Sequence, residues 1–468
     1  MTVPSVSFVS LGCAKNLVDS EKMLGLLAEA GCAIVGDGGT AEVAVVNTCG
    51  FLGVSRDEAL EVLGELAEQK RRGDVQRIVV AGCLVQRDGQ RLIEDVPEID
   101  ALVGVNNRAD IVRAVTETSK SQKVKKSKRR DTAGERTVFL GEYHPASWVD
   151  ANRSDRARLR LTPKHYAYLR ISEGCDQKCT FCTIPSIRGP MHSKTVDEIV
   201  AEAREMIADG VVELILIGQD TTSFGHDIGY AAGLAGLLRA LNRLDDLSWI
   251  RLMYVYPSVL SDEILDAVAE CDKVLSYIDI PLQHIDDGVL KAMYRRVTRQ
   301  ETEALLQRVR DRIPGVVVRT TFIAGFPGES EAAFETLRAF VRDFGFDAMG
   351  VFPYSSEPGT PADRMKDRIP TEVIESRMEA LMETQQAVAF AKARGRVGQT
   401  LNVLIDDFGR EGVCPARHAG QAPEVDSLVY VDGLECDPGG FATVRCVAAQ
   451  EYDLIARPVG SSLPILRD

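Results

Sequence analysis

No apolar run in the 468-residue sequence approaches the roughly 20 residues that a membrane-spanning helix needs. The first residues, Met1–Phe8, also lack a basic stretch followed by a long apolar one, so a secretory signal peptide is not expected. Positive charge is in deficit, because 55 Lys and Arg residues face 69 Asp and Glu residues and leave a net charge of −14. We therefore expect a cytoplasmic protein that does not bind membranes and has no overall attraction to nucleic acid.

Cysteines, in contrast, are numerous. The sequence has eleven, and without an export signal we expect them to remain reduced and available as metal ligands. Hydrophobic residues make up 45% of the sequence and charged residues 26%, which is ordinary for globular proteins. The length predicts about three domains.

Residues 1–118 alternate short apolar runs with helical patterns. The runs Val6–Leu11, Val43–Val46 and Ile78–Val80 are typical of buried parallel strands, and a further strand and helix are expected at Ala101–Val105 and Asp110–Glu117. This order predicts a doubly wound α/β domain. The other helices are expected at Asn16–Ala30, Ser55–Arg71 and Gln90–Glu94.

Residues 119–160 show no clear periodicity and are predicted to be a partly flexible linker. Within them, Lys120–Arg130 has seven basic residues in eleven. A solvated run of charge explains this stretch more simply than a dedicated binding site does.

In residues 161–393 the alternation resumes with six strand–helix units, which predict an incomplete (β/α)6 barrel rather than a closed eightfold one. The last segment, 394–468, has short strands separated by Gly, Pro and Asp turns, and predicts a small antiparallel β-barrel. The six strands of the incomplete barrel are expected at Tyr166–Ile171, Val211–Ile217, Trp249–Val255, Val274–Ile280, Val316–Ile323 and Phe346–Phe352.

Three cysteines follow the first of these strands in the spacing Cys175-x-x-x-Cys179-x-x-Cys182. Three thiolates can hold three irons of a 4Fe–4S cube and leave the fourth iron open, whereas structural clusters and structural zinc sites usually have four ligands. The motif, with Phe181 before its last cysteine, resembles that of the radical-SAM enzymes, in which S-adenosylmethionine binds the open iron. A three-ligand zinc site and a chance spacing are the alternatives.

Glycines and polar side chains follow later strands at the same end of the predicted barrel. Glycine lets the backbone approach a ligand closely, and an amide can bind the polar groups of that ligand. The carboxyl ends of barrel strands are where active sites form. Gln219, Gly325 and Gly328 are therefore predicted, with Phe181, to line the cofactor pocket.

A second set of cysteines is widely spaced in the sequence. Cys13, Cys49 and Cys83 each follow one of the first three predicted strands. The carboxyl ends of parallel strands lie at one edge of a sheet, where doubly wound folds bind ligands. We therefore predict a second three-thiolate cluster there, with simple burial of small apolar residues as the alternative. Two such clusters suggest a sulfur-insertion reaction in which the cofactors carry the difficult step.

These motifs resemble the methylthiotransferase family over nearly the whole chain. The resemblance lies in Leu11–Asn16 (Leu-Gly-Cys-Ala-Lys-Asn), Asn47–Gly50 (Asn-Thr-Cys-Gly) and Ala81–Cys83 (Ala-Gly-Cys), in the later cysteine triplet, and in a last domain similar to a TRAM domain. It implies two 4Fe–4S clusters, of which the first carries sulfur and the second binds S-adenosylmethionine. It also implies an external electron donor such as flavodoxin or ferredoxin.

One branch of this family modifies an isopentenylated adenosine in tRNA, and another places a methylthio group on the β-carbon of an aspartate in small-subunit ribosomal protein twelve. Val18–Glu21, Tyr166–Gly174 and Ile184–Ser186 resemble the second branch. Residues 394–468 contain seven Arg, no Lys and eleven Asp or Glu, a net charge of −4. Phosphate contacts need basic surfaces, so this acidic segment fits a basic ribosomal protein better than tRNA. The tRNA methylthiotransferase is the alternative function.

The resemblance implies a ribosomal protein substrate, free or on the small subunit, and the long basic linker allows an incidental contact with ribosomal RNA. A non-catalytic RNA- or ribosome-binding factor is the alternative from another class of protein. Such a factor would contain about one zinc per site and no iron or sulfide.

Overall fold

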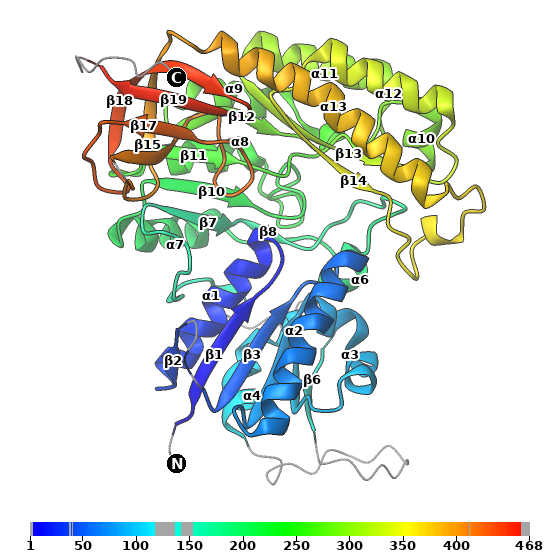
Figure 1. Cartoon of the computed structure of the whole chain (residues 1–468), viewed down its shortest axis with the longest axis vertical. Helices are drawn as coiled ribbons and strands as arrows, with labels where there is room; N and C mark the ends of the chain where they lie inside the picture. The colour runs from blue at the N-terminus through cyan, green and yellow to red at the C-terminus, as the bar shows by residue number, and fades with distance from the viewer. Residues whose placement is uncertain are drawn as a thin grey trace. The chain divides into compact units, whose positions relative to one another are not determined.

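The computed structural model describes residues 3–36, 39, 41–117, 136–141, 153–410 and 412–459. The chain divides into two compact units, which are described separately (Figure 1). The first unit comprises Met1–Leu161, Glu173–Gln177 and Cys182–Lys194, and the second comprises Thr162–Ser172, Lys178–Phe181 and Thr195–Asp468. Among the described residues, no helix has the length and apolar character needed to cross a membrane.

The first unit is built on a six-stranded parallel sheet flanked by helices. Its strands are β1 (Ser5–Ser10), β2 (Ala33–Val35), β3 (Val43–Thr48), β4 (Arg77–Gly82), β5 (Ala101–Gly104) and β6 (Thr137–Phe139). Its helices include α1 (Ala14–Glu29), α2 (Gly53–Arg72), α3 (Cys83–Asp95), α4 (Ile111–Thr116) and α6 (Ile184–Arg188).

The strand order of this sheet is β2-β1-β3-β4-β5-β6. Successive side chains of a strand point to opposite faces, so neighbouring residues of β3 enter different cores. Val45 packs with residues of α1 and α4, whereas Val46 packs with residues of α2 and α3. Helices therefore cover both faces, and the doubly wound domain predicted from the sequence is confirmed.

Some details of this unit differ from the sequence prediction. Strands β2 and β6 are not predicted, because runs of three residues show no recognisable alternation. Strand β6 lies within the stretch predicted as a linker and pairs with β5. Helix α3 begins at Cys83, well before the predicted start at Gln90. The basic run Lys120–Arg130 lies outside the described residues, so the linker there stays a prediction.

The second unit contains a six-stranded parallel sheet and a small barrel. The sheet strands are β7 (Tyr166–Arg170), β10 (Glu213–Ile217), β11 (Trp249–Leu252), β12 (Val274–Asp279), β13 (Val317–Ala324) and β14 (Ala348–Pro353). The helices that accompany them are α7 (Val196–Ala208), α8 (Gly233–Asn242), α9 (Asp262–Glu270), α10 (Asp287–Ala292), α11 (Arg299–Arg312), α12 (Glu331–Phe344) and α13 (Thr371–Gly395).

The order β14-β13-β12-β11-β10-β7 places consecutive strands side by side, and within the described residues β7 and β14 do not pair. The incomplete barrel predicted from the sequence is thus confirmed. Local signals also start its helices where expected. At the start of α7, the Thr195 hydroxyl accepts a hydrogen bond from the Glu198 amide, while the Glu198 carboxylate accepts one from the Thr195 amide.

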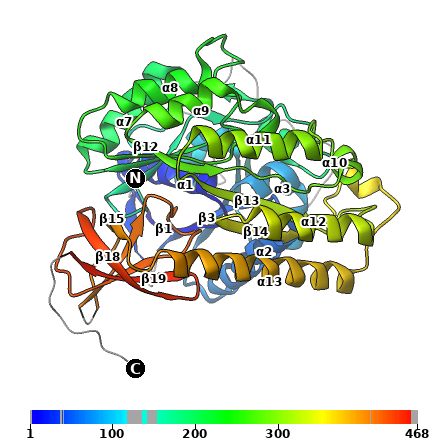
Figure 2. The ribbon, with the colours of Figure 1, turned by 90° about the horizontal axis from the view of Figure 1, so that it is seen from above.

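The last strands, β15 (Thr400–Ile405), β16 (Val413–His418), β17 (Val429–Asp432), β18 (Phe441–Gln450) and β19 (Asp453–Pro458), form a closed barrel in the order β15-β16-β17-β19-β18. The sequence predicts this barrel without β16, from strand patterns at Leu401–Ile405, Ser427–Val431, Ala442–Val447 and Tyr452–Ala456. It predicts only antiparallel pairs, whereas β17 and β19 are parallel. Figure 2 shows α13 running along β14 toward the barrel. Trp249 of β11 packs edge-on against Phe441 of β18, with 5.0 Å between ring centroids.

Candidate functional site

Three cysteines of the first unit lie at the carboxyl edge of its sheet. Cys13 follows β1 and is the N-cap residue of α1, and Cys49 directly follows β3. Cys83 follows β4 and is the first residue of α3. Because β3 lies between β1 and β4, the structure brings the three residues to neighbouring positions, as the sequence predicts. Each precedes or begins a helix, whose N-terminal end favours negative charge.

Two glycines allow the segments that carry these cysteines to approach each other. A Cβ atom on Gly12 would lie 2.7 Å from Cβ of Cys49, and one on Gly50 would lie 2.8 Å from backbone atoms of Leu84. Gly12 also has a φ of +94°, which favours glycine. A larger residue at either position would push the cysteine segments apart.

The close approach of these segments fits a shared inorganic group. Within the described ranges, no three His, Cys, Asp or Glu side chains are arranged to hold a single metal ion. In a 4Fe–4S cube each thiolate binds a different iron, so its ligands are spaced more widely than those of one ion. The three cysteines are chemically suited to such a cube, and their role as its ligands stays a prediction.

Arg188 connects this cysteine set to a buried group of charges. It is 2% exposed, and its guanidinium donates to Cys83 Sγ (3.1 Å), to Asp19 Oδ2 (2.8 Å) and to Glu173. Arg108 pairs with Asp19 from another direction and lies 3.7 Å from Glu173. Two arginines and two carboxylates thus balance each other's charge, and we call Asp19, Arg108, Glu173 and Arg188 the cysteine-side network.

The three thiols differ in acidity. Burial raises the pKa of Cys83 to about 12, although Arg188 acts in the opposite direction, and burial also raises the pKa of Cys49. The Cys13 side chain is exposed to solvent but surrounded by enough protein for desolvation to oppose its ionisation. Lys15 and Arg188 outweigh that effect and lower the pKa of Cys13. A metal must therefore displace the protons of Cys49 and Cys83 to obtain three thiolates.

The triplet Cys175, Cys179 and Cys182 lies in the loop between β8 (Ser172–Glu173) and α6. Cys175 is buried, and its amide donates to the Gly189 carbonyl (3.2 Å). Cys175 and Cys182 belong to the first unit, and Cys179 belongs to the second. Their joint role as ligands of one cluster stays a prediction.

Cys179 has two polar neighbours within the second unit. Its Sγ lies 3.8 Å from the Tyr256 hydroxyl and accepts a long hydrogen bond from Arg295 Nη1 (3.6 Å). The Arg295 guanidinium also lies 4.2 Å from the centre of the Tyr256 ring, a cation–π contact. Neither residue can be identified from the sequence, because both belong to segments far from the cysteine motif.

Two buried polar atoms at the carboxyl ends of β7 and β10 lack a hydrogen-bond partner in the part of the chain that the structure describes. They are Ser172 Oγ and Gln219 Oε1. A Cβ atom on Gly218 would lie 2.7 Å from Ser172 Oγ, so glycine allows the two strand ends to meet. Buried polar atoms without partners are destabilising. Their presence here fits the predicted cofactor pocket, where a polar ligand would satisfy them.

The other predicted pocket residues have structural roles. Phe181 packs edge-on against Phe326, with 6.5 Å between ring centroids. The Gly325 amide donates to Glu329 (2.8 Å), and a Cβ atom on Gly325 would lie 2.3 Å from Ile374 of α13. Packing against α13 is therefore sufficient to require glycine at this position. Gly328 has a φ of +85°, as its turn requires. Cofactor contacts of these residues stay predictions.

A second buried charge network lies at the amino end of the six-stranded sheet of the second unit. Glu213 at the start of β10 pairs with Arg251 (2.8 Å) and with Arg417 of the small barrel (2.7 Å). Arg417 also pairs with Asp406 (2.7 Å), which lies 2.9 Å from His165 Nε2. We call Glu213, Arg251, Asp406 and Arg417 the barrel-side network. It attaches the small barrel to the sheet.

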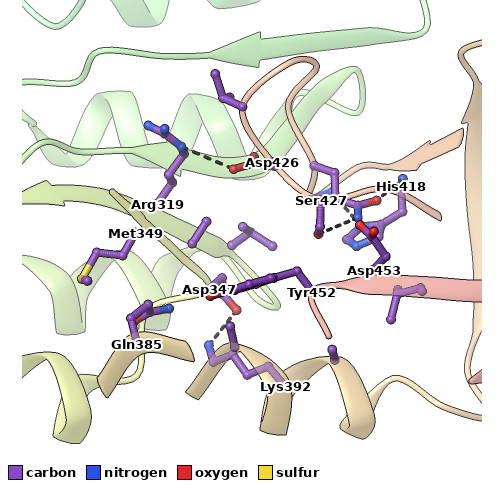
Figure 3. Close-up of a pocket in the computed structure, with 18 of the residues that line it drawn as sticks. Arg319, Asp347, Met349, Gln385, Lys392, His418, Asp426, Ser427, Tyr452 and Asp453 are labelled. Carbon is purple, nitrogen blue, oxygen red and sulfur yellow. Dashed lines mark hydrogen bonds and ion pairs between the residues drawn. The ribbon is translucent and has the colours of Figure 1, made fainter. Parts of the chain in front are cut away.

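A cavity of about 450 Å³ lies between β13, β14, α13 and the small barrel (Figure 3). Arg319 faces Asp426 (3.4 Å) and Lys392 faces Asp347 (2.6 Å) on its wall. None of the six cysteines in the two sets lines it. The cavity is thus a feature of the junction between the barrel and α13, and not of either cysteine set.

Family models match separate parts of the chain. The Uncharacterized protein family UPF0004 matches residues 5–104, the Radical SAM superfamily matches residues 169–341, and the TRAM domain matches residues 397–459. These three ranges contain the first cysteine set, the second cysteine set and the small barrel.

Curated relatives resemble the chain over nearly its full length. The ribosomal protein uS12 methylthiotransferase RimO of Anaeromyxobacter sp. (strain K) is 42% identical over 452 residues, which cover 96% of this chain and 92% of the relative. The protein of the same name from Trichlorobacter lovleyi is 40% identical and covers 97% and 98%. A solved structure of TsrM, a radical S-adenosylmethionine methyltransferase from Kitasatospora setae, has a TM-score of 0.54 at 16% identity, covering 76% of this chain and 74% of that one. This likeness shows a shared fold.

Proposed function

The chain belongs to the family of ribosomal protein uS12 methylthiotransferases named RimO, and from this membership we propose that it adds a methylthio group to the β-carbon of an aspartate in uS12. It is a radical-SAM enzyme that uses S-adenosylmethionine and 4Fe–4S clusters. When bound, these cofactors supply the methyl group, the sulfur and the electron chemistry.

The convergence of Cys13, Cys49 and Cys83 carries this proposal. A radical-SAM site needs only one three-cysteine motif, so a second set at a sheet edge calls for a second inorganic group. In our proposal this set holds the cluster that carries sulfur. Arg188 donates to Cys83 Sγ and orients that ligand.

Cys175, Cys179 and Cys182 hold the cluster that binds S-adenosylmethionine in this proposal. Arg295 and the Tyr256 hydroxyl contact Cys179 Sγ and restrict its position. Ser172 Oγ and Gln219 Oε1 are the polar atoms of this chain that a bound cofactor would satisfy. Phe181, Gly325 and Gly328 complete the proposed pocket.

The chain's charge supports a basic ribosomal protein as substrate, because the whole chain has a net charge of −14. We propose that uS12 is modified either free or on the small subunit, in the cytoplasm, and that an external electron donor is required. A contact of the basic run Lys120–Arg130 with ribosomal RNA is proposed as incidental.

An anaerobic assay with two substrates tests the function. The reconstituted enzyme receives S-adenosylmethionine, dithionite and either purified uS12 or isopentenylated tRNA. We expect mass spectrometry to find a methylthio group on an aspartate of uS12 and none on the tRNA. A methylthiolated adenosine with unmodified uS12 would establish the tRNA enzyme instead.

A further inference from the structure

One surface of the second unit combines positive charge with access to a cysteine of the second set. Lys291, Tyr294, Arg295 and Arg296 line a cavity of about 490 Å³ between α10 and the start of α11. We call these four residues the arginine surface. Lys291, Tyr294 and Arg296 are exposed, and Arg295 is buried beneath them.

The arginine surface is attached directly to the loop that carries Cys179. Arg295 donates to Cys179 Sγ (3.6 Å) and lies over the ring of Tyr256 (4.2 Å), whose hydroxyl is 3.8 Å from the same sulfur. Thr180, the next residue in the loop, donates its amide to the Met293 carbonyl (3.1 Å). A molecule that touches Arg295 is therefore separated from a predicted cluster ligand by one side chain.

The positive charges of this surface are available to a partner. Two carboxylates also line the cavity: Asp287 accepts from the Arg299 amide (2.6 Å), and Glu301 accepts from the Thr298 amide (2.7 Å). Three cations of the lining thus face two anions and leave one net positive charge. Within the described ranges, neither Lys291 nor Arg296 forms an ion pair with a carboxylate. In a chain with a net charge of −14, this surface favours an acidic partner and repels a basic one such as the proposed substrate.

Tyr294 gives the surface an exposed aromatic anchor. Its side chain is 45% exposed, and its backbone has a φ of +58°, which is rare for a bulky residue. The Arg296 guanidinium lies 5.4 Å from the centre of its ring. Exposed Tyr and Arg side chains are enriched in protein interfaces, and strained backbone conformations occur often at functional sites.

We propose that the arginine surface is the docking site of an acidic one-electron carrier protein. This inference rests on the proposed function, because that function requires an electron donor. A docked carrier would give up one electron and become oxidised, and the cluster that Cys179 is proposed to hold would gain that electron and become reduced. RNA would also be attracted to positive charge. The contact between Arg295 and Cys179 favours an electron donor instead, because it gives a short path from the surface to a proposed cluster ligand.

Charge reversal at the two exposed cations tests the docking site. The variant carries Lys291→Glu and Arg296→Glu. The matched control carries Arg204→Glu and Arg243→Glu, two exposed residues on α7 and directly after α8, so the net charge changes by the same amount in both variants. Figure 2 shows α7 and α8 away from α10. Circular dichroism melting curves verify that both variants are folded.

The measurement is the rate of cluster reduction in stopped-flow absorbance, with reduced flavodoxin or with dithionite as donor. At low salt we expect flavodoxin to reduce the K291E/R296E variant about tenfold more slowly than the wild type, and the control at nearly the wild-type rate. This difference should shrink at high salt, because salt screens exposed charges. Dithionite needs no docking surface and should reduce all three proteins equally.

Equal flavodoxin rates in the wild type and the K291E/R296E variant would overturn the proposal. The docking proposal is also wrong if the K291E/R296E variant loses binding to a ribosomal RNA fragment but is reduced by flavodoxin at the wild-type rate. Modification of uS12 driven by dithionite depends only on the proposed function. A failure of docking can therefore be distinguished from a failure of that function.

Discussion

The two buried charge networks have the same composition and different surroundings. Each contains two arginines and two carboxylates. In the cysteine-side network, Arg188 also donates to Cys83 Sγ. In the barrel-side network, Arg417 binds carboxylates and a backbone carbonyl and lies over the ring of Tyr166, and the network ends at His165. The first network therefore contacts a reactive sulfur, whereas the second joins a small barrel to a sheet.

The difference shows that burial and ion pairing do not by themselves mark a functional residue. Removing one member of either network leaves an uncompensated buried charge, which destabilises a protein by about 3–5 kcal/mol. A loss of stability would therefore look similar in both cases. Only a measurement on the bound cluster or on the reaction distinguishes them.

Replacing the sulfur that Arg188 contacts should have the largest effect. We expect Cys83→Ala to abolish methylthiolation of uS12, because the proposed sulfur-carrying cluster loses one of its three ligands. Cleavage of S-adenosylmethionine should continue, since the second cysteine set is intact. Chromatography of the cleavage products and mass spectrometry of uS12 check both statements.

Cys271→Ala is the matched control, because Cys271 is a buried cysteine in the apolar core of the second unit. This variant should form both products. Methylthiolated uS12 from the Cys83→Ala enzyme would show that Cys83 is only a core residue.

Arg188→Gln should affect both stability and the cluster. Asp19 and Glu173 each lose a buried partner, so we expect the free energy of unfolding to fall by about 3–5 kcal/mol. The signal of the cluster on the first cysteine set should also change in electron paramagnetic resonance, because Cys83 loses a hydrogen bond. Denaturant titration and spectra of the reconstituted protein measure the two effects. An unchanged spectrum would make Arg188 purely structural.

Arg417→Gln should affect stability alone. Glu213 and Asp406 lose a shared partner, and we expect a loss of about 3 kcal/mol. Iron content and the electron paramagnetic resonance spectra should match the wild type, because this network does not contact a cysteine. If the folded variant loses iron, the barrel-side network also affects a cluster, and the proposed difference between the two networks is wrong.

Acid should weaken the barrel-side network, and we expect this effect on stability to be smaller than those of the three substitutions above. Burial opposes ionisation of Glu213, but Arg417 and Arg251 outweigh it and lower the pKa of that carboxyl. Partial burial likewise opposes ionisation of Asp406, but His165 and Arg417 outweigh it and lower the pKa of Asp406. Carboxylates with a lowered folded pKa stabilise the protein above their unfolded pKa of about 4. That stability is lost as the pH falls through the folded pKa.

A denaturant midpoint measured from pH 7 down to about pH 3 tests this dependence. Glu213→Gln cannot ionise at that position, so its stability should fall less steeply with acid than that of the wild type. Parallel curves for the two proteins would show that Glu213 does not contribute to the acid response.

The sequence predicts the two cysteine sets for different reasons. Cys175, Cys179 and Cys182 are recognisable from spacing alone. Cys13, Cys49 and Cys83 are recognisable because apolar runs such as Val43–Val46 locate the strand ends where they meet. The folded chain then brings them to one sheet edge.

The residues around the cysteines could not be predicted in the same way. Arg188, Tyr256 and Arg295 come from separate turns and helices, so only the folded chain shows that they contact cysteine sulfurs. The turn position of Gly325 predicts the approach of a ligand, and only the folded chain shows that this glycine also packs against Ile374. A glycine in a turn has the same local sequence in either role.

Anaerobic quantitation of iron and acid-labile sulfide shows whether each cysteine set holds its own cube. We expect about eight irons and eight sulfides per reconstituted chain, and about four of each when Cys13, Cys49 and Cys83 are all replaced by Ala. About four irons in the wild type, unchanged in the triple variant, would contradict this expectation.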